Sequence, residues 1–112
     1  MIFRKPTTVI VQIQAKIVWQ LAQDPESKVW IGVCPDLNLN AEGDTFPDVL
    51  ACAGDAMKLL FQDLFEENEL DTYLQRRGWR RQGDPVPGAK VRFDTPFDFT
   101  RVPIGAIATA TA

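Results

Sequence analysis

A long alternation of apolar and polar side chains opens the chain. Every odd-numbered position of the segment is apolar, whereas glutamine or lysine occupies most of the even positions. The odd positions are Val9, Val11, Ile13, Ala15, Ile17, Trp19 and Leu21. Because successive side chains of a β-strand point to opposite faces of the sheet, this period of two predicts one unusually long, half-buried strand from Val9 to Leu21.

Two shorter strands follow this segment. A turn-forming run, Asp-Pro-Glu-Ser at residues 24–27, separates it from a β-rich stretch at residues 29–34, so the two segments are expected to form an antiparallel hairpin. Pro35 interrupts the second strand because proline donates no hydrogen bond to a neighbouring strand. Leu37, Leu39 and Ala41 then alternate with polar residues and predict a third strand that ends at Gly43.

Helical spacing begins after Gly43. Thr45 can cap the first turn, and the pattern predicts an amphipathic helix that ends near Glu67 and covers one face of the sheet. Its apolar stripe comprises Phe46, Leu50, Ala53, Met57, Leu60, Phe61, Leu64 and Phe65. Asn68 is expected to cap a shorter second helix that runs through Arg77 and stops at Gly78.

The predicted order of elements is therefore β-β-β-α-short α-β, with the last strand at residues 90–93. This order predicts an α+β fold in which one main helix packs on one face of an antiparallel sheet. We expect a single domain over residues 1–94. The tail, residues 95–112, is expected to be strand-like at first and then disordered, and it shows too few helical signals for a separate DNA-binding domain.

The composition argues against an enzyme. The chain of 112 residues contains no histidine, which removes the commonest general base and the commonest metal ligand, and excludes Ser-His and Cys-His nucleophile pairs. We therefore expect a binding protein without a cofactor or a metal. Neither a membrane-spanning segment nor a signal peptide is recognisable, so the cytoplasm is the expected location and Cys34 and Cys52 are expected to be reduced thiols.

Charge is distributed unevenly along the chain, whose net charge is −3. Residues 42–71 contain nine acidic residues and the single base Lys58, whereas residues 72–92 contain six bases and only Asp84 as an acid. The two segments either compensate each other or present an acidic surface to a basic partner. Binding to DNA through this chain alone is not expected, because the protein as a whole is acidic.

Several short motifs occur together in one order. Residues 29–37 read Val-Trp-Ile-Gly-Val-Cys-Pro-Asp-Leu, residues 42–45 read Glu-Gly-Asp-Thr, and the long amphipathic helix follows. This arrangement resembles the core of the HicB antitoxin family, and residues 70–79 resemble the segment after the helix in some HicB-like proteins. The chain departs from the family where Asn38-Leu39-Asn40 replaces a common Pro-Gly-Cys tripeptide.

The resemblance implies a partial ribonuclease-H-like fold without nuclease activity. It also implies a partner: a small basic ribonuclease toxin of the HicA type, whose active site the antitoxin occludes. The residues that we expect to contact such a partner are Trp30, Asp36, Glu42 and Asp44. A structural role is the plainer explanation for Trp30, which is expected in the core, and for Asp36 and Asp44, which follow a proline at a corner and precede a helix N-terminus, respectively.

Two other functions remain open. The chain could be a solitary HicB-like protein that forms a homo-oligomer, a dimer or a tetramer, without any toxin. The possible subunit contact is a second apolar stripe of the main helix, formed by Cys52, Ala56 and Leu59, although the second helix could cover the same residues. A metal-dependent nuclease built on Asp36, Glu42 and Asp44 is a third and weaker alternative.

Overall fold

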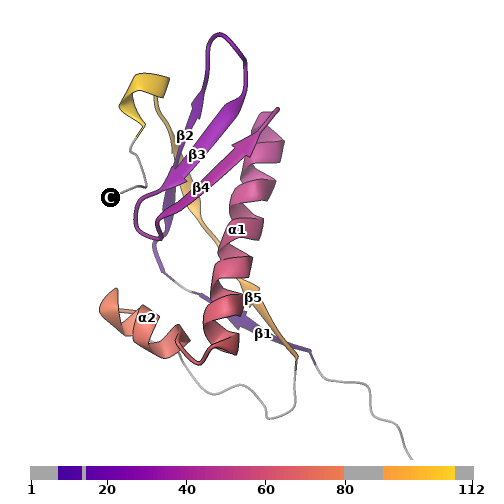
Figure 1. Cartoon of the computed structure of the whole chain (residues 1–112), viewed down its shortest axis with the longest axis vertical. Helices are drawn as coiled ribbons and strands as arrows, with labels where there is room; N and C mark the ends of the chain where they lie inside the picture. Colours follow the sequence, from indigo (N-terminus) through magenta and orange to yellow (C-terminus); the bar gives the residue numbers. More distant parts are fainter. Residues whose placement is uncertain (1–7, 14, 80–89, 108–112) are drawn as a thin grey trace, which may run out of the picture. The chain divides into compact units, whose positions relative to one another are not determined.

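The computed structural model describes residues 8–13, 15–79 and 90–107 (Figure 1). It has the α+β class that the sequence predicts. The elements are, in chain order, β1 (Thr8–Gln12), β2 (Val18–Gln23), β3 (Trp30–Cys34), β4 (Leu39–Gly43), α1 (Phe46–Glu66), α2 (Leu70–Arg76), β5 (Lys90–Asp94), β6 (Asp98–Arg101) and the 3-10 turn η1 (Ile104–Ala106). Over the described ranges no helix is long and apolar enough to cross a membrane.

The chain divides into two compact units. We call Lys16–Met57 with Pro96–Ala112 the four-stranded unit, and Met1–Ala15 with Lys58–Thr95 the two-stranded unit. Helix α1 contributes its first part to the four-stranded unit and its last part to the two-stranded unit. The chain passes from one unit to the other three times, and the last passage follows Thr95. The predicted domain boundary at residue 94 lies next to this passage.

The sheet of the four-stranded unit has the order β4-β3-β2-β6. Strands β2 and β3 are antiparallel, as are β3 and β4, which confirms the predicted hairpin and the predicted third strand. Strand β6 lies within the segment expected to be a tail, and it pairs with β2 in parallel. The sheet is therefore mixed. The expected disorder at the end of the tail concerns residues 108–112, which lie outside the described residues.

The side chain of Asp24 stabilises the β2–β3 turn by accepting hydrogen bonds from backbone N–H groups of the turn. One carboxylate oxygen of Asp24 accepts hydrogen bonds from the backbone N–H groups of Glu26, at 2.8 Å, and Ser27, at 3.2 Å. The Asp24 N–H donates to the Val29 carbonyl at 2.9 Å and closes the hairpin. Aspartate commonly initiates a turn in this way, because its carboxylate can accept a hydrogen bond from the backbone N–H two residues later.

Helix α1 begins where the sequence predicts. The Thr45 hydroxyl accepts a hydrogen bond from the Asp48 N–H at 3.2 Å and so satisfies one of the free donors of the first turn. In the four-stranded unit, α1 buries Val49, Ala53 and Met57 completely against the sheet. The indole N–H of the equally buried Trp19 on β2 points at the Met57 sulfur, 3.4 Å away.

The two-stranded unit has an aromatic core. Strands β1 and β5 pair in parallel, and Phe93 of β5 lies 6.2 Å from the ring of Phe61 and 5.9 Å from that of Phe65, measured between centroids. Tyr73 of α2 packs edge-on against Phe61 at 6.4 Å. The last two turns of α1 are therefore held by β5 and α2 through aromatic contacts, which prefer these tilted and edge-on geometries.

The prediction of one continuous strand from Val9 to Leu21 is wrong. The segment contains two strands in different sheets, since β1 pairs with β5 whereas β2 pairs with β3 and β6. Wherever the burial of neighbouring positions in this segment is described, the odd position is nevertheless the more buried one, from the half-buried Val9 to the fully buried Leu21. An alternation of polarity reports which face of a strand is buried, and it does not report which strand supplies the hydrogen bonds.

The prediction that Asn68 caps the second helix is also wrong. Asn68 has a positive φ of 58° and ends α1 instead: its N–H donates to the Phe65 carbonyl at 3.1 Å, and the Glu69 N–H donates to the Leu64 carbonyl at 2.8 Å. This pair of bonds is a Schellman motif, which favours residues that tolerate the left-handed region. Gly78, at φ 73°, ends α2 in the same way, and this predicted stop is confirmed.

The approach of β4 to the start of α1 requires a residue without a side chain. A Cβ atom added to Gly43 would collide with the Val49 backbone nitrogen and lie 2.8 Å from the Asp48 carbonyl carbon. We predict that Gly43→Ala lowers the free energy of unfolding by about 2–3 kcal/mol, because backbone atoms must move to admit the methyl group. Urea denaturation measures the change. Gly105→Ala is the matched control, because a Cβ atom there meets nothing within 4 Å, and a similar loss in both variants would contradict the explanation.

Candidate functional site

The charge of the protein is separated between its two units. The four-stranded unit contains eight acidic and three basic residues, which gives −5, whereas the two-stranded unit contains seven acidic and nine basic residues, which gives +2. The two values account for the net charge of −3. The acidic segment expected from the sequence, residues 42–71, is divided between the units: four of its nine acidic residues belong to the four-stranded unit and five to the two-stranded unit. The larger net negative charge is nevertheless that of the four-stranded unit.

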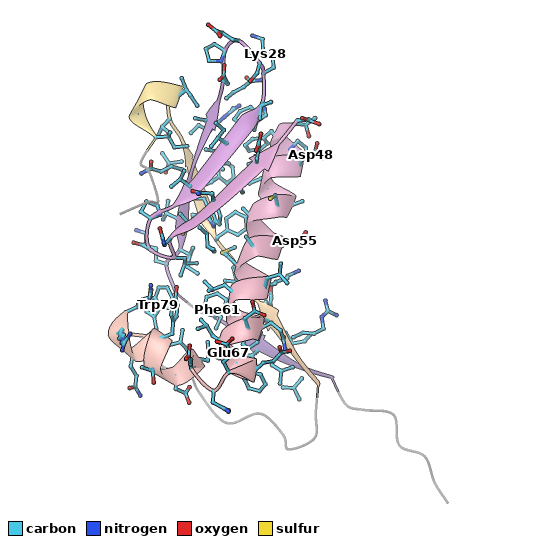
Figure 2. The ribbon with its side chains drawn as sticks, in the orientation of Figure 1. Lys28, Asp48, Asp55, Phe61, Glu67 and Trp79 are labelled. Carbon is cyan, nitrogen blue, oxygen red and sulfur yellow. The ribbon has the colours of Figure 1, made fainter. Side chains whose placement is uncertain are left out.

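Carboxylates gather at one end of the four-stranded unit. Because Trp30 pairs with both Gln23 and Gly43, the β2–β3 turn and the β4–α1 junction lie at the same end of the sheet. Figure 2 shows Lys28 of the turn and Asp48 of the first turn of α1 at this end. We call it the acidic end, and its acidic residues are Asp24, Glu26, Glu42, Asp44 and Asp48. All five except the half-buried Asp24 are exposed.

The predicted contact residues do not form one cluster. Glu42 and Asp44 belong to the acidic end and are exposed. Asp36 is also exposed, but it lies in the β3–β4 turn at the other end of β4. At about 3.3 Å per residue, the length of β4 separates Asp36 from Glu42 and Asp44 by ~13 Å. One small basic surface could contact Glu42 and Asp44 together, whereas reaching Asp36 as well requires a partner that follows the edge strand β4.

Trp30 is a core residue. Only 8% of it is exposed, and its ring packs edge-on against Phe46, the first residue of α1, at 5.2 Å between centroids. Trp30 therefore offers little surface to a partner and instead holds the start of α1 against β3. The neighbouring Glu42 and Asp44 depend on this contact, because it fixes the junction on which they lie.

Trp30 belongs to a cluster of three aromatic rings and one arginine. The ring of Phe99 on β6 lies 5.3 Å from that of Phe46, and the Arg101 guanidinium lies 4.8 Å from the Trp30 ring and 5.1 Å from the Phe46 ring. We did not identify Phe46, Phe99 and Arg101 as a group from the sequence. The alternation of Phe97, Phe99 and Arg101 with Asp98 and Thr100 was the available signal for a strand with these side chains on one face.

The second predicted stripe of α1 is partly accessible. Cys52 and Ala56 are half-buried, and Leu59 is 65% exposed. Each could contact another subunit, so the role that we expected for them stays a prediction. Among the described residues, no group of three or more histidine, cysteine, aspartate or glutamate side chains is arranged to hold a metal ion.

The chain matches no family model, no curated protein and no solved structure. Its resemblance to the HicB antitoxins therefore rests on the motifs at residues 29–37, 42–45 and 70–79 alone. It enters the functional argument below as a hypothesis, beside the geometry and charge of the four-stranded unit.

The two cysteines differ in environment. Burial raises the pKa of the Cys34 thiol above its ordinary value of 9.0, although backbone hydrogen bonds at Leu37 and Asp36 partly oppose the shift. Cys34 is completely buried, whereas Cys52 is half-buried on α1, and both are free thiols. Because thiolates are the reactive form of cysteine, Cys34 should be the less reactive of the two.

We predict that a thiol reagent at mildly alkaline pH modifies Cys52 in the folded protein and modifies Cys34 only after unfolding. Cys52→Ala should abolish the fast reaction and Cys34→Ala should preserve it, as read by mass spectrometry. The raised pKa of Cys34 contributes stability that is complete below the thiol pKa of the unfolded chain. This contribution is lost as the pH rises toward the folded pKa. Fast labelling of Cys34 would contradict its assigned burial.

Proposed function

We propose that this protein is a cytoplasmic, antitoxin-like binding protein that captures a small basic ribonuclease toxin and occludes its active site. The observation that carries the proposal is the concentration of exposed carboxylates at the acidic end of a unit whose net charge is −5. The class of partner comes from the HicB-like order of motifs, of which residues 29–37 and 42–45 lie in the same unit. No catalytic role is assigned to any residue of the chain.

The structural roles of the motif residues support the fold that the resemblance implies. Pro35 begins the corner between β3 and β4, and its carbonyl accepts a hydrogen bond at 3.3 Å from the backbone N–H of Asn38, the first residue of the tripeptide in which the chain departs from the family. Gly43 permits the close approach of β4 to α1, and Thr45 caps the helix. These residues form the corner and the helix start through which the chain passes from three antiparallel strands to the helix that covers them. The HicB-like order of these residue types therefore supports a HicB-like architecture.

The binding part of the proposal is supported by electrostatics. A ribonuclease must attract the phosphates of RNA, so the surface around its active site is basic. Glu42, Asp44 and Asp48 can pair with the same basic groups and exclude RNA from them. Complementary charge of this kind raises the rate of association and is weakened by salt, which gives the proposal a measurable signature.

The first experiment is affinity capture of the tagged protein from its native host at low and at moderate salt, with the recovered proteins identified by mass spectrometry. The expected result is a small, basic, histidine-containing protein whose expression alone stops growth and whose capture falls as salt rises. Recovery of this chain alone under both conditions would contradict the proposed partner. It would favour the solitary homo-oligomer, the second candidate, for which the exposed edge strand β6 is the supporting observation.

Charge reversal then locates the surface. We predict that Glu42→Lys and Asp44→Lys each weaken capture of the toxin about threefold to tenfold at low salt, and less at higher salt, because rim charges act through screened attraction. Asp63→Lys is the matched control, since Asp63 is exposed on α1 within the two-stranded unit. Asp36→Lys reports whether the partner extends along β4. Equal effects of the control and the two test variants, measured by calorimetry, would remove the acidic end as the docking surface.

A further inference from the structure

Strand β6 is an open edge of the four-stranded sheet. It pairs with β2 on one side, and no other described strand pairs with it. All four of its residues, Asp98, Phe99, Thr100 and Arg101, are exposed. An edge strand of this kind presents unpaired backbone donors and acceptors and is a template for another strand.

The backbone geometry identifies which groups are unpaired. The Asp98 N–H donates to the Ile17 carbonyl at 2.8 Å, and the Val102 N–H donates to the Leu21 carbonyl at 2.9 Å. Because the hydrogen-bonding direction alternates along a strand, Thr100, which lies opposite Gln20, also points toward β2. The N–H and C=O groups of Phe99 and Arg101 therefore point away from β2, toward the open edge.

The side chains of the same two residues lie on the face of the sheet that α1 covers. Phe99 remains 43% exposed although its ring contacts that of Phe46, and among the described residues it is one of three large apolar side chains that are exposed. Arg101 is exposed as well, with its guanidinium over the rings of Trp30 and Phe46. The edge thus offers one aromatic and one cationic side chain beside its free backbone groups.

We propose that β6 pairs in antiparallel fashion with β6 of a second copy of this chain, about a two-fold axis at Thr100. Opposed residues of an antiparallel pair lie on the same face of a sheet, so Phe99 can oppose Arg101 of the partner subunit but cannot oppose its Thr100. This register uses every outward N–H and C=O group of β6, and it extends the sheet across the two subunits.

The strand is complementary to itself in this register. In this register the partner's Arg101 lies opposite the exposed ring of Phe99. Turning the Arg101 guanidinium from the Trp30 and Phe46 rings of its own subunit onto the Phe99 ring of the other exchanges one cation–π contact for another, and the symmetry repeats the exchange. On the opposite face, Thr100 meets Thr100 of the partner subunit at the axis. Pro96 and Pro103 flank the strand and limit the pairing to the residues between them, because proline supplies no N–H.

The other edge of the sheet is less suited to a second copy. Strand β4 exposes Glu42 and belongs to the acidic end, so self-pairing there would bring like charges together. The proposed dimer uses β6 and the proposed toxin contact uses the acidic end, so the two proposals stand independently. They also respond oppositely to salt: screening relieves the repulsion between two units of charge −5, whereas it weakens capture of a basic toxin.

A pair of substitutions at one position tests the register. Phe99→Lys places a cation opposite the partner's Arg101, whereas Phe99→Glu places a carboxylate there, and both remove the same ring. Sedimentation velocity of the full chain should show a dimer for the unchanged protein. We expect the dissociation constant of the Phe99→Lys dimer to exceed that of the Phe99→Glu dimer by about tenfold or more, because each change acts twice in a symmetric interface.

The double variant Phe99→Lys with Arg101→Glu should restore dimerisation, because it recreates opposite charges at both contacts. Asn40→Lys, on the exposed face of β4, is the matched control and should leave the dissociation constant unchanged. Circular dichroism confirms that each variant is folded. A cross-link provides a second readout: Thr100→Cys in a Cys52→Ala background should form a disulfide between subunits on mild oxidation, since a non-hydrogen-bonded pair brings the two Cα atoms to about 4.5 Å.

Three results would overturn the proposal. The first is a monomer at high micromolar concentration. The second is a dimer that Phe99→Lys and Phe99→Glu weaken equally, because the interface would then not oppose Phe99 and Arg101. The third is Thr100→Cys cross-linking no faster than Asn40→Cys in the same background. If the protein is a monomer, hydrogen exchange of the Phe99 and Arg101 amides can be measured with and without a captured toxin. Protection of these amides only in the presence of the toxin would assign the edge to that partner instead.

Discussion

Helix α1 buries Val49, Ala53 and Met57 completely within the four-stranded unit and Phe61 completely within the two-stranded unit. Removing a side chain of this kind from water contributes about 1.5–3 kcal/mol for the larger residues, so the stripe is a large part of the stability of so small a protein. The burial is possible only because the chain brings a strand close to the helix at its start. Gly43 permits that approach, and the Trp30–Phe46 contact holds it.

The same constraint explains the position of the acidic end. Trp30, Gly43 and Phe46 hold β3, β4 and the first turn of α1 together, and the carboxylates of the acidic end lie on and beside these elements. Glu42, Asp44 and Asp48 therefore project into solvent at a junction whose backbone is firmly placed. Charges on a junction that is held in this way lose little freedom on binding, which supports the proposal that this end of the unit is the docking surface.

The two edges of the four-stranded sheet differ in what they can accept. Strand β4 carries exposed polar residues and an acid, which discourage pairing with another copy, whereas β6 places Phe99 and Arg101 beside free backbone groups. A binding protein with one charged edge and one self-complementary edge could engage a basic partner and a second copy at the same time. This combination joins the two functional hypotheses that the sequence left as alternatives.

The sequence by itself determined the local structure of this protein. The helix cap at Thr45, the stop at Gly78, the β2–β3 turn and the burial of the odd-numbered residues from Val9 to Leu21 follow from interactions within a few residues, so pattern and composition predict them. The carboxylates at Glu42 and Asp44 were identified for the same reason, because exposed charges beside a turn are visible in the sequence.

Only the tertiary structure decided which strands pair and which charges gather. An alternation of polarity is the same whether a strand bonds β5 or β3, so the division of the first segment into β1 and β2 was hidden until the non-local hydrogen bonds were known. The separation of Asp36 from Glu42 depends on the direction of β4, and the meeting of Trp30, Phe46 and Arg101 joins residues far apart in the chain. These features rest on long-range contacts, which the periodicity of a single segment does not encode.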